Sequence, residues 1–483
     1  MRETASRWRR RPPYFLGVAP FYVKPPKYIG ETLQQNLQHA QALARQGRQE
    51  QLEQDRPVFV PPSADMPARP MKKSSFQKAV RKVVQTQAIS EVDVRAAKKR
   101  VLYPTKPKSS VQKVPVLGGQ PITLETALAL RKQVFGNGGD MLVPAMNEWL
   151  GQSFCFNDAD TPQGYSLIMQ KNSVKGLAMC VQGYILKHLL FTRRGPRANT
   201  DPTALLRAST KMQEEALVGA LSDILWRAGD RQHVVLCLTQ ENTYLTENPE
   251  FQADGCTERV NTFDFKKQDE LTFNLKKYLF EFLSEDGNGM LLLLYSVVLS
   301  RGFTKLQEDM AGEDHPLIET NATIHPCVVT LVLTGRATRY LHNGIIYEGT
   351  EDTMAKPKTG ILTRSEIGLL VWARMDGSGG GGQGAVGSRL KTPSLPIWVT
   401  RCNDAYGLLF NPNRDLIRDY HAENRFDLHY FSSTITQTDA TIVTIDTRNQ
   451  VAVEEYNSPP LENLIHTKWA GADINWNGTT AHV

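Results

Sequence analysis

The segment from Tyr165 to Phe191 constrains the fold of this chain more than any other stretch of the sequence. Beyond its first third, its apolar side chains recur at helical spacing, at Leu177, Val181, Tyr184, Ile185 and Leu189. A stripe with this period is typical of a helix that turns one face toward a hydrophobic core. The segment therefore predicts a buried helix that begins near Lys175.

The turn into this helix carries a resemblance, together with the run Val-Gln-Gly-x-x-Leu-x-x-Leu-Leu-Phe that begins at Val181. Both resemble the MINDY family of cysteine-type deubiquitinases. Active members read Gln-x-x-x-Gly-Pro-Cys-Gly at the turn, where the Gln serves the oxyanion hole and the Cys attacks the isopeptide carbonyl. A gapless match anchored on Tyr165 and Val181 carries that Gln to Met169 and the Cys to Lys175, and only Gly176 agrees.

The chemistry of the family motif needs those residue types. A thiolate at a helix N-terminus is stabilised by the helix dipole and by free N–H groups, and it is the thiolate that attacks. A protonated Lys175 is no nucleophile, and Met169 cannot donate a hydrogen bond to an oxyanion. Removing one hydrogen-bond donor from an oxyanion hole typically lowers the rate by about 10²–10³. The resemblance leaves one alternative role for a long cation at position 175, which is to block the channel that admits the ubiquitin tail in active relatives or to hold a carboxylate.

A second stretch, Pro396 to Phe410, resembles the family segment that carries the catalytic His. The gapless match carries that His to Ala405 and the next aromatic position to Tyr406, so no general base stands there. A slip of one residue would bring Gln170 or Tyr406 into a family position, but no slip supplies both a Cys and a His.

The resemblance covers residues 120 to 478 and implies an α+β, papain-like fold of the cysteine-protease type, with a central helix packed on a mostly antiparallel sheet. The chain is most like the inactive B-type relative of the family's fourth branch. We therefore expect that it is not an enzyme: a pseudo-deubiquitinase that binds ubiquitin or polyubiquitin without cleaving it. The alternative is residual cleavage of lysine-forty-eight-linked chains through a displaced Cys, for which Cys180 and Cys402 are nearest. We expect both thiols to be structural.

Composition sets apart a basic N-terminal region 1–115, and the resemblance implies a MINDY-like catalytic-type domain without the catalytic residues over 116–483. Residues 71–113 carry twelve Lys or Arg against two acidic residues, a local charge of 12 − 2 = +10 against +6 for the chain. Such a run is typical of a solvated, disordered tail. Nuclear import, an anionic membrane surface and RNA remain alternatives, but no aromatic residues are interleaved, which argues against sequence-specific nucleic-acid binding. One exposed helix is expected over 31–55.

The six cysteines are scattered without a C-x-x-C pair, which predicts neither a zinc site nor a disulfide scaffold and favours the cytoplasm or nucleus. The Pro-broken apolar run 14–23 does not read as a signal peptide. The longest apolar run, 290–299, is shorter than the ~18–20 residues of a membrane span. The Gly-rich loop 377–384 lacks the Gly-Lys-Ser ending of a phosphate loop, so no cofactor is implied. The oligomeric state stays open.

Local patterns predict the remaining elements. Thr123 is a candidate N-cap for a helix to Phe135. Further helices are expected over 203–227 and, by capping-box spacing, over 363–372. The apolar runs 290–299 and 327–334 fit either a strand or a buried helix, and the resemblance favours helices. Strands are expected at 233–239, 395–399, 406–410, 429–432 and 441–446. For the histidines without ligand spacing we expect packing or surface roles; these include His188, His325, His421 and His429.

Overall fold

The computed structural model describes residues 113–137, 143–192, 202–246, 249–285, 287–347, 357–373, 386–433, 441–450 and 458–479. The chain divides into two units, Met1–Leu102 and Tyr103–Val483, and all that follows concerns the second. The predicted tail up to residue 112, its helix and the Gly-rich loop lie outside the described residues. The boundary between 115 and 116 stays a prediction.

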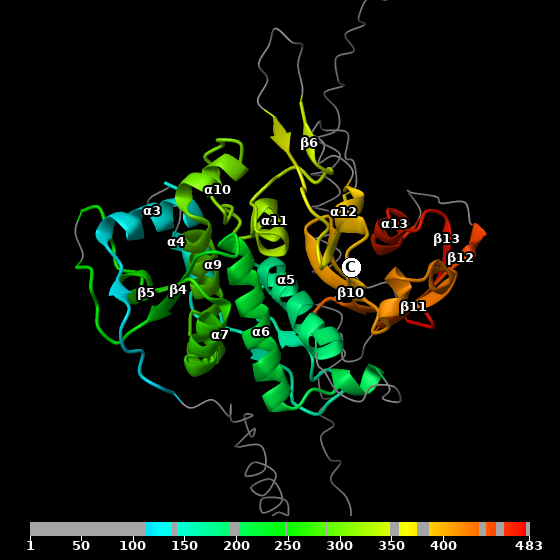
Figure 1. Ribbon diagram of the computed structural model, residues 1–483, viewed down its shortest axis with the longest axis horizontal. Coiled ribbons are helices and arrows are strands. Elements are labelled where there is room, and N and C mark those ends of the chain that lie inside the picture. Colours follow the sequence, from blue (N-terminus) through cyan, green and yellow to red (C-terminus); the bar gives the residue numbers. More distant parts are fainter. Residues whose placement is uncertain are drawn as a thin grey trace, which may run out of the picture. The chain divides into compact units, whose positions relative to one another are not determined.

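Helix α5 (Lys175–Leu186) lies at the centre of the described fold (Figure 1). It begins at Lys175, as predicted, and every later residue in it is buried. Its later side chains are apolar or small except that of Gln182, whose amide accepts from the Leu167 N–H and donates to the Tyr165 carbonyl. It runs directly into a π-helical segment, Lys187–Thr192. Four elements pack on it: α6 (Thr210–Ala228), α11 (Pro326–Thr334), β9 (Ile397–Cys402) and β10 (Ala405–Phe410).

The helical side of the fold carries a small antiparallel sheet in the order β1 (Gln120–Pro121), β5 (Val260–Phe265), β4 (Val234–Thr239). Helix α9 (Gly289–Arg301) packs on β4. The apolar runs 290–299 and 327–334 are therefore helices, α9 and α11, as the resemblance favours. The other helices there are α3 (Leu124–Phe135), α4 (Val143–Trp149), α7 (Gln268–Lys277), α8 (Phe280–Leu283) and α10 (Phe303–Asp309).

The second sheet has six strands in the order β13, β12, β11, β10, β9, β8, and it is antiparallel except for the β8–β9 pair. Its two faces pack against different cores because successive side chains point to opposite faces. Val399 and Leu408 belong to the core of α5, whereas Trp398 and Leu409 pack in a second core beneath α13. The new elements are β8 (Gly368–Trp372), β11 (Arg425–Phe431), β12 (Thr441–Gln450), α13 (Pro460–His466) and β13 (Ala472–Asn475).

Short elements join these layers. Two antiparallel pairs are β2 (Cys155–Phe156) with β3 (Leu167–Ile168), and β6 (Ile345–Ile346) with β7 (Lys358–Thr359). A single-turn helix, α12 (Ser388–Lys391), packs on β8. The 3-10 turns are η3 (Pro202–Leu206), η4 (Thr257–Arg259), η5 (Arg414–Ile417) and η6 (Tyr420–Glu423). Helix and sheet segregate, so the fold is mixed α+β.

Two local predictions are wrong. The segment 363–372 is not a helix, because Gly368–Trp372 forms β8 and pairs in parallel with β9, with Gly368 opposite Trp398. Its capping-box signal fails because the Glu366 carboxylate binds Lys187 and Arg227 instead of its own backbone. The helix expected over 203–227 is divided into η3 and α6, with Ser209 as the N-cap of α6.

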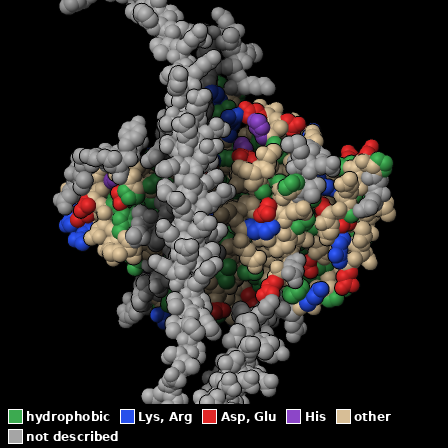
Figure 2. Space-filling model, turned by 180° about the vertical axis from the view of Figure 1, so that it is seen from behind, with side chains coloured by type: hydrophobic (Ala, Val, Ile, Leu, Met, Phe, Trp, Pro, Cys, Tyr) green, Lys and Arg blue, Asp and Glu red, His purple; other side chains and the backbone are tan. Residues whose placement is uncertain are grey.

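The apolar helices are short, and the visible surface carries charges of both signs. Within the described ranges no single helix has the length and hydropathy of a span; α9 and α10 reach them only together, across a bend of 88°. On the face in Figure 2, acidic and basic side chains lie interspersed among other residues.

Candidate functional site

The turn before α5 places Lys175 at the first helical position. The Lys175 N–H donates to the carbonyl of Asn172 at 3.1 Å, and no side chain caps the helix. Among the described residues the Lys175 ammonium has no hydrogen-bond or ion-pair partner. Burial lowers its pKa from the ordinary lysine value. An unpaired cation therefore stands at the positive end of the helix dipole, where it is disfavoured by about 0.3–1 kcal/mol.

Strand β10 and the segment before α11 pack against this turn. A Cβ added to Gly176 would lie 3.0 Å from Cε2 of Tyr406 and 2.5 Å from Cδ1 of Ile324, so only glycine fits this close approach without movement. Tyr406 is buried and faces α5, whereas its neighbour Ala405 is exposed. Because adjacent strand residues point to opposite faces, the side chain at 406, not that at 405, meets the helix.

The segment before the turn carries Met169 and Gln170. Met169 is buried and Gln170 is exposed, yet both line one small pocket with Val174 and Cys155. Cys155 lies on β2, which pairs with β3 just before Met169. The structure therefore brings Met169, Lys175 and Tyr406 around one helix turn and adds Cys155, which the sequence did not single out.

The cysteine thiols differ in exposure. Cys180 is fully buried inside α5, as predicted, and burial raises its pKa. Cys402 is 2% exposed on β9, and burial raises its pKa to about 11. Cys155 alone of the six is partly exposed, and burial followed by the charge of Glu285 raises its pKa. In the free protein all three are thiols rather than thiolates near neutral pH.

Three of the four histidines named above, His325, His421 and His429, have structural or surface roles, as the sequence predicts, whereas His188 pairs with Asp223. His325 caps α11 by accepting a hydrogen bond at Nδ1 from the Cys327 N–H at 3.3 Å. Burial and the neighbouring cations lower its pKa to about 4, so it is neutral. His429 stacks on Phe410, with ring centroids 5.0 Å apart. His421 lies in the exposed turn η6.

A charged network at the far end of α5 was missed from the sequence. The Lys187 ammonium lies 2.9 Å from Asp223 Oδ2 and 3.0 Å from Glu366 Oε2, and Arg227 binds the same Glu366. His188 Nε2 lies 2.8 Å from Asp223 Oδ2. Burial opposes ionisation of Asp223, but the His188 hydrogen bond and the Lys187 charge prevail and hold its pKa at about 2. The network ties the π-helical segment that follows α5, and α6, to the segment before β8.

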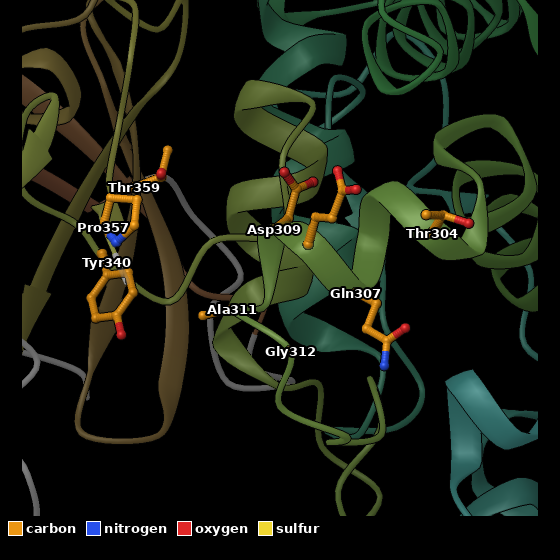
Figure 3. Close-up of a pocket in the computed structure, with 9 residues that line it drawn as sticks. Thr304, Gln307, Asp309, Ala311, Gly312, Tyr340, Pro357 and Thr359 are labelled. Atoms are coloured by element: carbon orange, nitrogen blue, oxygen red, sulfur yellow. The ribbon is translucent and has the colours of Figure 1, made fainter. Parts of the chain in front are cut away.

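A larger cavity lies elsewhere, between α10 and the segments that carry Tyr340, Pro357 and Thr359 (Figure 3). Its volume is about 450 Å³, and Gln307 and Asp309 from α10 face it from the other side. None of Met169, Lys175 and Ala405 lines it. In the described part of the chain, no three His, Cys, Asp or Glu side chains cluster as metal ligands would.

Comparison with known proteins places the chain in a family. The family model described as "Deubiquitinating enzyme MINDY-3/4, conserved domain" matches residues 131–478. The chain is 34% identical over 365 residues to "Probable ubiquitin carboxyl-terminal hydrolase MINDY-4" of Xenopus tropicalis, covering 75% of this chain and 46% of that protein. The Homo sapiens protein of that name is 31% identical over 363 residues, covering 74% and 46%. The chain thus spans about half the length of these relatives.

A more distant relative agrees with this assignment. "Ubiquitin carboxyl-terminal hydrolase MINDY-3" of Homo sapiens is 24% identical over 271 residues, covering 51% of this chain and 56% of that protein. No solved structure matches the chain.

These names correct one expectation. The prediction that the chain is not an enzyme is wrong, because its relatives are named as ubiquitin carboxyl-terminal hydrolases, which are enzymes. The physical reason is that Met169, Lys175 and Ala405 argue only against one arrangement of attacking groups, at positions assigned by a gapless match. They say nothing against attack by another group. The match over 131–478 and the identities above show that this chain belongs to the MINDY-3/4 family of deubiquitinating enzymes.

Proposed function

We propose that this chain recognises ubiquitin or polyubiquitin through the surface around the first turn of α5, as a ubiquitin carboxyl-terminal hydrolase-type domain. The observation that carries the proposal is the meeting of Gly176, Tyr406 and Ile324, three segments far apart in sequence, at the helix start. The family resemblance concerns the first two of these segments. The papain-like character of the fold and the correspondence of Met169 and Lys175 to the family's catalytic positions are parts of the same proposal. For the family's His position, the contact of Tyr406 with Gly176 favours 406 over the exposed Ala405 to which the gapless match carries it.

A second candidate function is hydrolysis of lysine-forty-eight-linked chains through a displaced thiol. Cys155 favours it, because this partly exposed thiol shares a pocket with Gln170 and Val174 at the start of α5. The raised pKa of Cys155 means that bound ubiquitin, or a residue it brings into place, has to accept the thiol proton before attack. A cytoplasmic or nuclear location of the protein stays a proposal, which rests on the cysteine pattern.

Binding is tested by titrating fluorescently labelled ubiquitin and lysine-forty-eight-linked diubiquitin with the full chain. Ile168 is 44% exposed on β3 and lines the pocket beside Val174, so Ile168→Arg is expected to weaken binding at least about tenfold. Phe273 is 68% exposed on α7 and provides the matched control, because Phe273→Arg alters an apolar surface that is not at α5. No binding at high concentration, or equal loss in both variants, would overturn the proposal.

Cleavage is tested with a ubiquitin probe whose C-terminus reacts with thiols, followed by mass spectrometry of the labelled peptide. Labelling of Cys155, and its loss together with chain cleavage in Cys155→Ser, supports the second function. Cleavage that survives in Cys155→Ser rules this thiol out as the nucleophile.

A further inference from the structure

A polar cavity lies at the end of α5 that is remote from the candidate site. Its volume is about 250 Å³, and its walls come from the π-helical segment after α5, from α6 and α7, and from the segment before β8. Helix α6 lies beside both α5 and α7 (Figure 1). None of Met169, Lys175 and Tyr406 lines this cavity, and the 12 residues of α5 separate it from the first turn by about 18 Å.

The charged side chains that line the cavity leave one positive charge over. Lys187 and Arg227 are neutralised by the carboxylates of Asp223 and Glu366, which they share. Arg231 also lines the cavity, and its exposed guanidinium has no hydrogen-bond or ion-pair partner among the described residues. The cavity is therefore polar, with one uncompensated cation that solvent reaches.

The backbone holds Arg231 in a conformation that residues with a Cβ rarely adopt. Its φ is +59°, and that of Asp230 before it is +54°. The Arg231 N–H donates to the Trp226 carbonyl at 2.8 Å, which fixes this turn against the end of α6. Left-handed non-glycine residues are strained, and they occur often at ligand-binding sites. The π-helical turn that contributes Lys187 is a second rare backbone feature that is frequent at functional sites.

Trp226 supplies a flat apolar wall. The side chain is partly buried, packs against the main core and also lines the cavity. Its indole N–H has no acceptor in the described part of the chain. A guanidinium beside an indole suits a ligand that joins an anionic group to a planar apolar body.

The anionic group that fits best is a carboxylate. Its two oxygens match the fork of an arginine, and its single charge balances that of Arg231. A phosphate dianion would add a second negative charge next to Asp223 and Glu366, which repel it. The volume admits a ligand smaller than most drug-sized molecules. We propose that this cavity binds a small organic carboxylate through Arg231, with the planar part of the ligand against Trp226. The site is separate from ubiquitin recognition and does not depend on it.

The test uses 4-fluorobenzoate and 4-fluorobenzamide, which have the same ring and differ in charge. Broadening of the fluorine NMR line in the presence of the full chain measures binding. We expect a Kd of about 1 mM or below for the acid and at least about tenfold weaker binding of the amide. Inorganic phosphate at the same concentration is expected to leave the bound acid in place. Absence of binding, equal binding of acid and amide, or displacement of the acid by phosphate would each overturn the proposal.

Two variants locate the bound acid. Arg231→Gln removes the charge at an exposed position and is expected to weaken binding of the acid at least about tenfold. Arg207 provides the matched control, because it is an exposed arginine near the other end of α6 that has no side-chain partner among the described residues and does not line the cavity. Arg207→Gln is therefore expected to change nothing. Thermal unfolding verifies that each variant is folded. Unchanged binding in Arg231→Gln, or an equal loss in both variants, would overturn the proposal.

Discussion

Gly176 and Tyr406 touch at the start of α5, where a Cβ on the glycine would stand 3.0 Å from the tyrosine ring. Ala405, the position to which the gapless match carries the family His, is exposed on the other side of the strand. The structure therefore decides between positions 405 and 406, because only the side chain at 406 faces α5. The sequence alone did not show which of the two does so. A base that is to reach the first turn of α5 has to stand at 406.

Catalytic replacement gives the first prediction. Lys175→Cys combined with Tyr406→His is expected to cleave lysine-forty-eight-linked diubiquitin at least about 10²-fold faster than Lys175→Cys alone, the usual effect of a positioned general base. Lys175→Cys with Ala405→His is expected to gain nothing, because that side chain points away from α5. Gel-based cleavage rates of the three proteins provide the measurement. Equal gains for both pairs would show that the strand alternation does not decide which residue reaches the helix.

The ion network at the end of α5 predicts a pH dependence of stability. The pKa of Asp223 falls from 3.8 to about 2 on folding, so its contribution of about 2 kcal/mol is fully present above pH 4 and is lost as the pH falls toward 2. We expect Asp223→Asn to destabilise the fold at pH 6 and to differ little from the parent chain near pH 2. Urea unfolding across this range measures the difference.

Asp264 serves as the control for that experiment. Its carboxylate lies 2.7 Å from His233 Nε2, but both side chains are about half exposed. Exposed pairs contribute about 0–1 kcal/mol, so Asp264→Asn is expected to change stability little at pH 6. A comparable loss in both variants would contradict the assignment of Asp223 to a stabilising network.

Arg301 yields a contrast between two carboxylates. Its Nε and Nη2 donate to Asp309 at 2.7 and 2.9 Å, where both side chains are nearly buried, and its Nη1 donates to the more exposed Asp230 at 2.7 Å. Removing one partner of a buried pair costs about 3–5 kcal/mol, which we expect for Asp309→Ala. Asp230→Ala is expected to cost about 1 kcal/mol. Chemical denaturation of both variants checks the order, and the reverse order would refute it.

Thiol accessibility gives the fourth prediction. Cys155 is partly exposed, whereas the other five cysteines are buried. Under native conditions at pH 8, iodoacetamide is expected to modify Cys155 well before any other cysteine, and peptide mass spectrometry identifies the site. Early modification of Cys180 would mean that the start of α5 opens readily, since this thiol is fully buried.

Sequence reasoning succeeded where a local pattern and the core demand the same structure. The helix begins at Lys175 as its apolar period predicts, although its neighbours cover it on all sides and not on one face alone. Thr123 caps α3 by accepting from the Thr126 N–H, as its position predicts. It failed at 363–372, where the capping-box spacing was real but the parallel ladder with β9 prevailed. Pairing with a distant strand determined the structure of that segment, and the local residue spacing does not indicate this pairing.

The site could be predicted only in part, for the same reason. Met169 and Lys175 follow from a motif within one turn, but which of 405 and 406 faces α5 depends on strand register. Cys155 reaches the pocket through the pairing of β2 with β3. Lys187 meets Asp223 and Glu366 across separations of 36 and 179 residues, and no sequence pattern connects charges so far apart.

Strand β13 has a consequence for shortened versions of this protein. It pairs with β12 from Thr444 to Asp446 and so covers one border of the six-stranded sheet. A chain cut before Ala472 would leave those amides and carbonyls of β12 open, a template to which a strand of another copy can add. Such a truncated chain would then self-associate through the unpaired edge of β12, independently of the turn at Lys175.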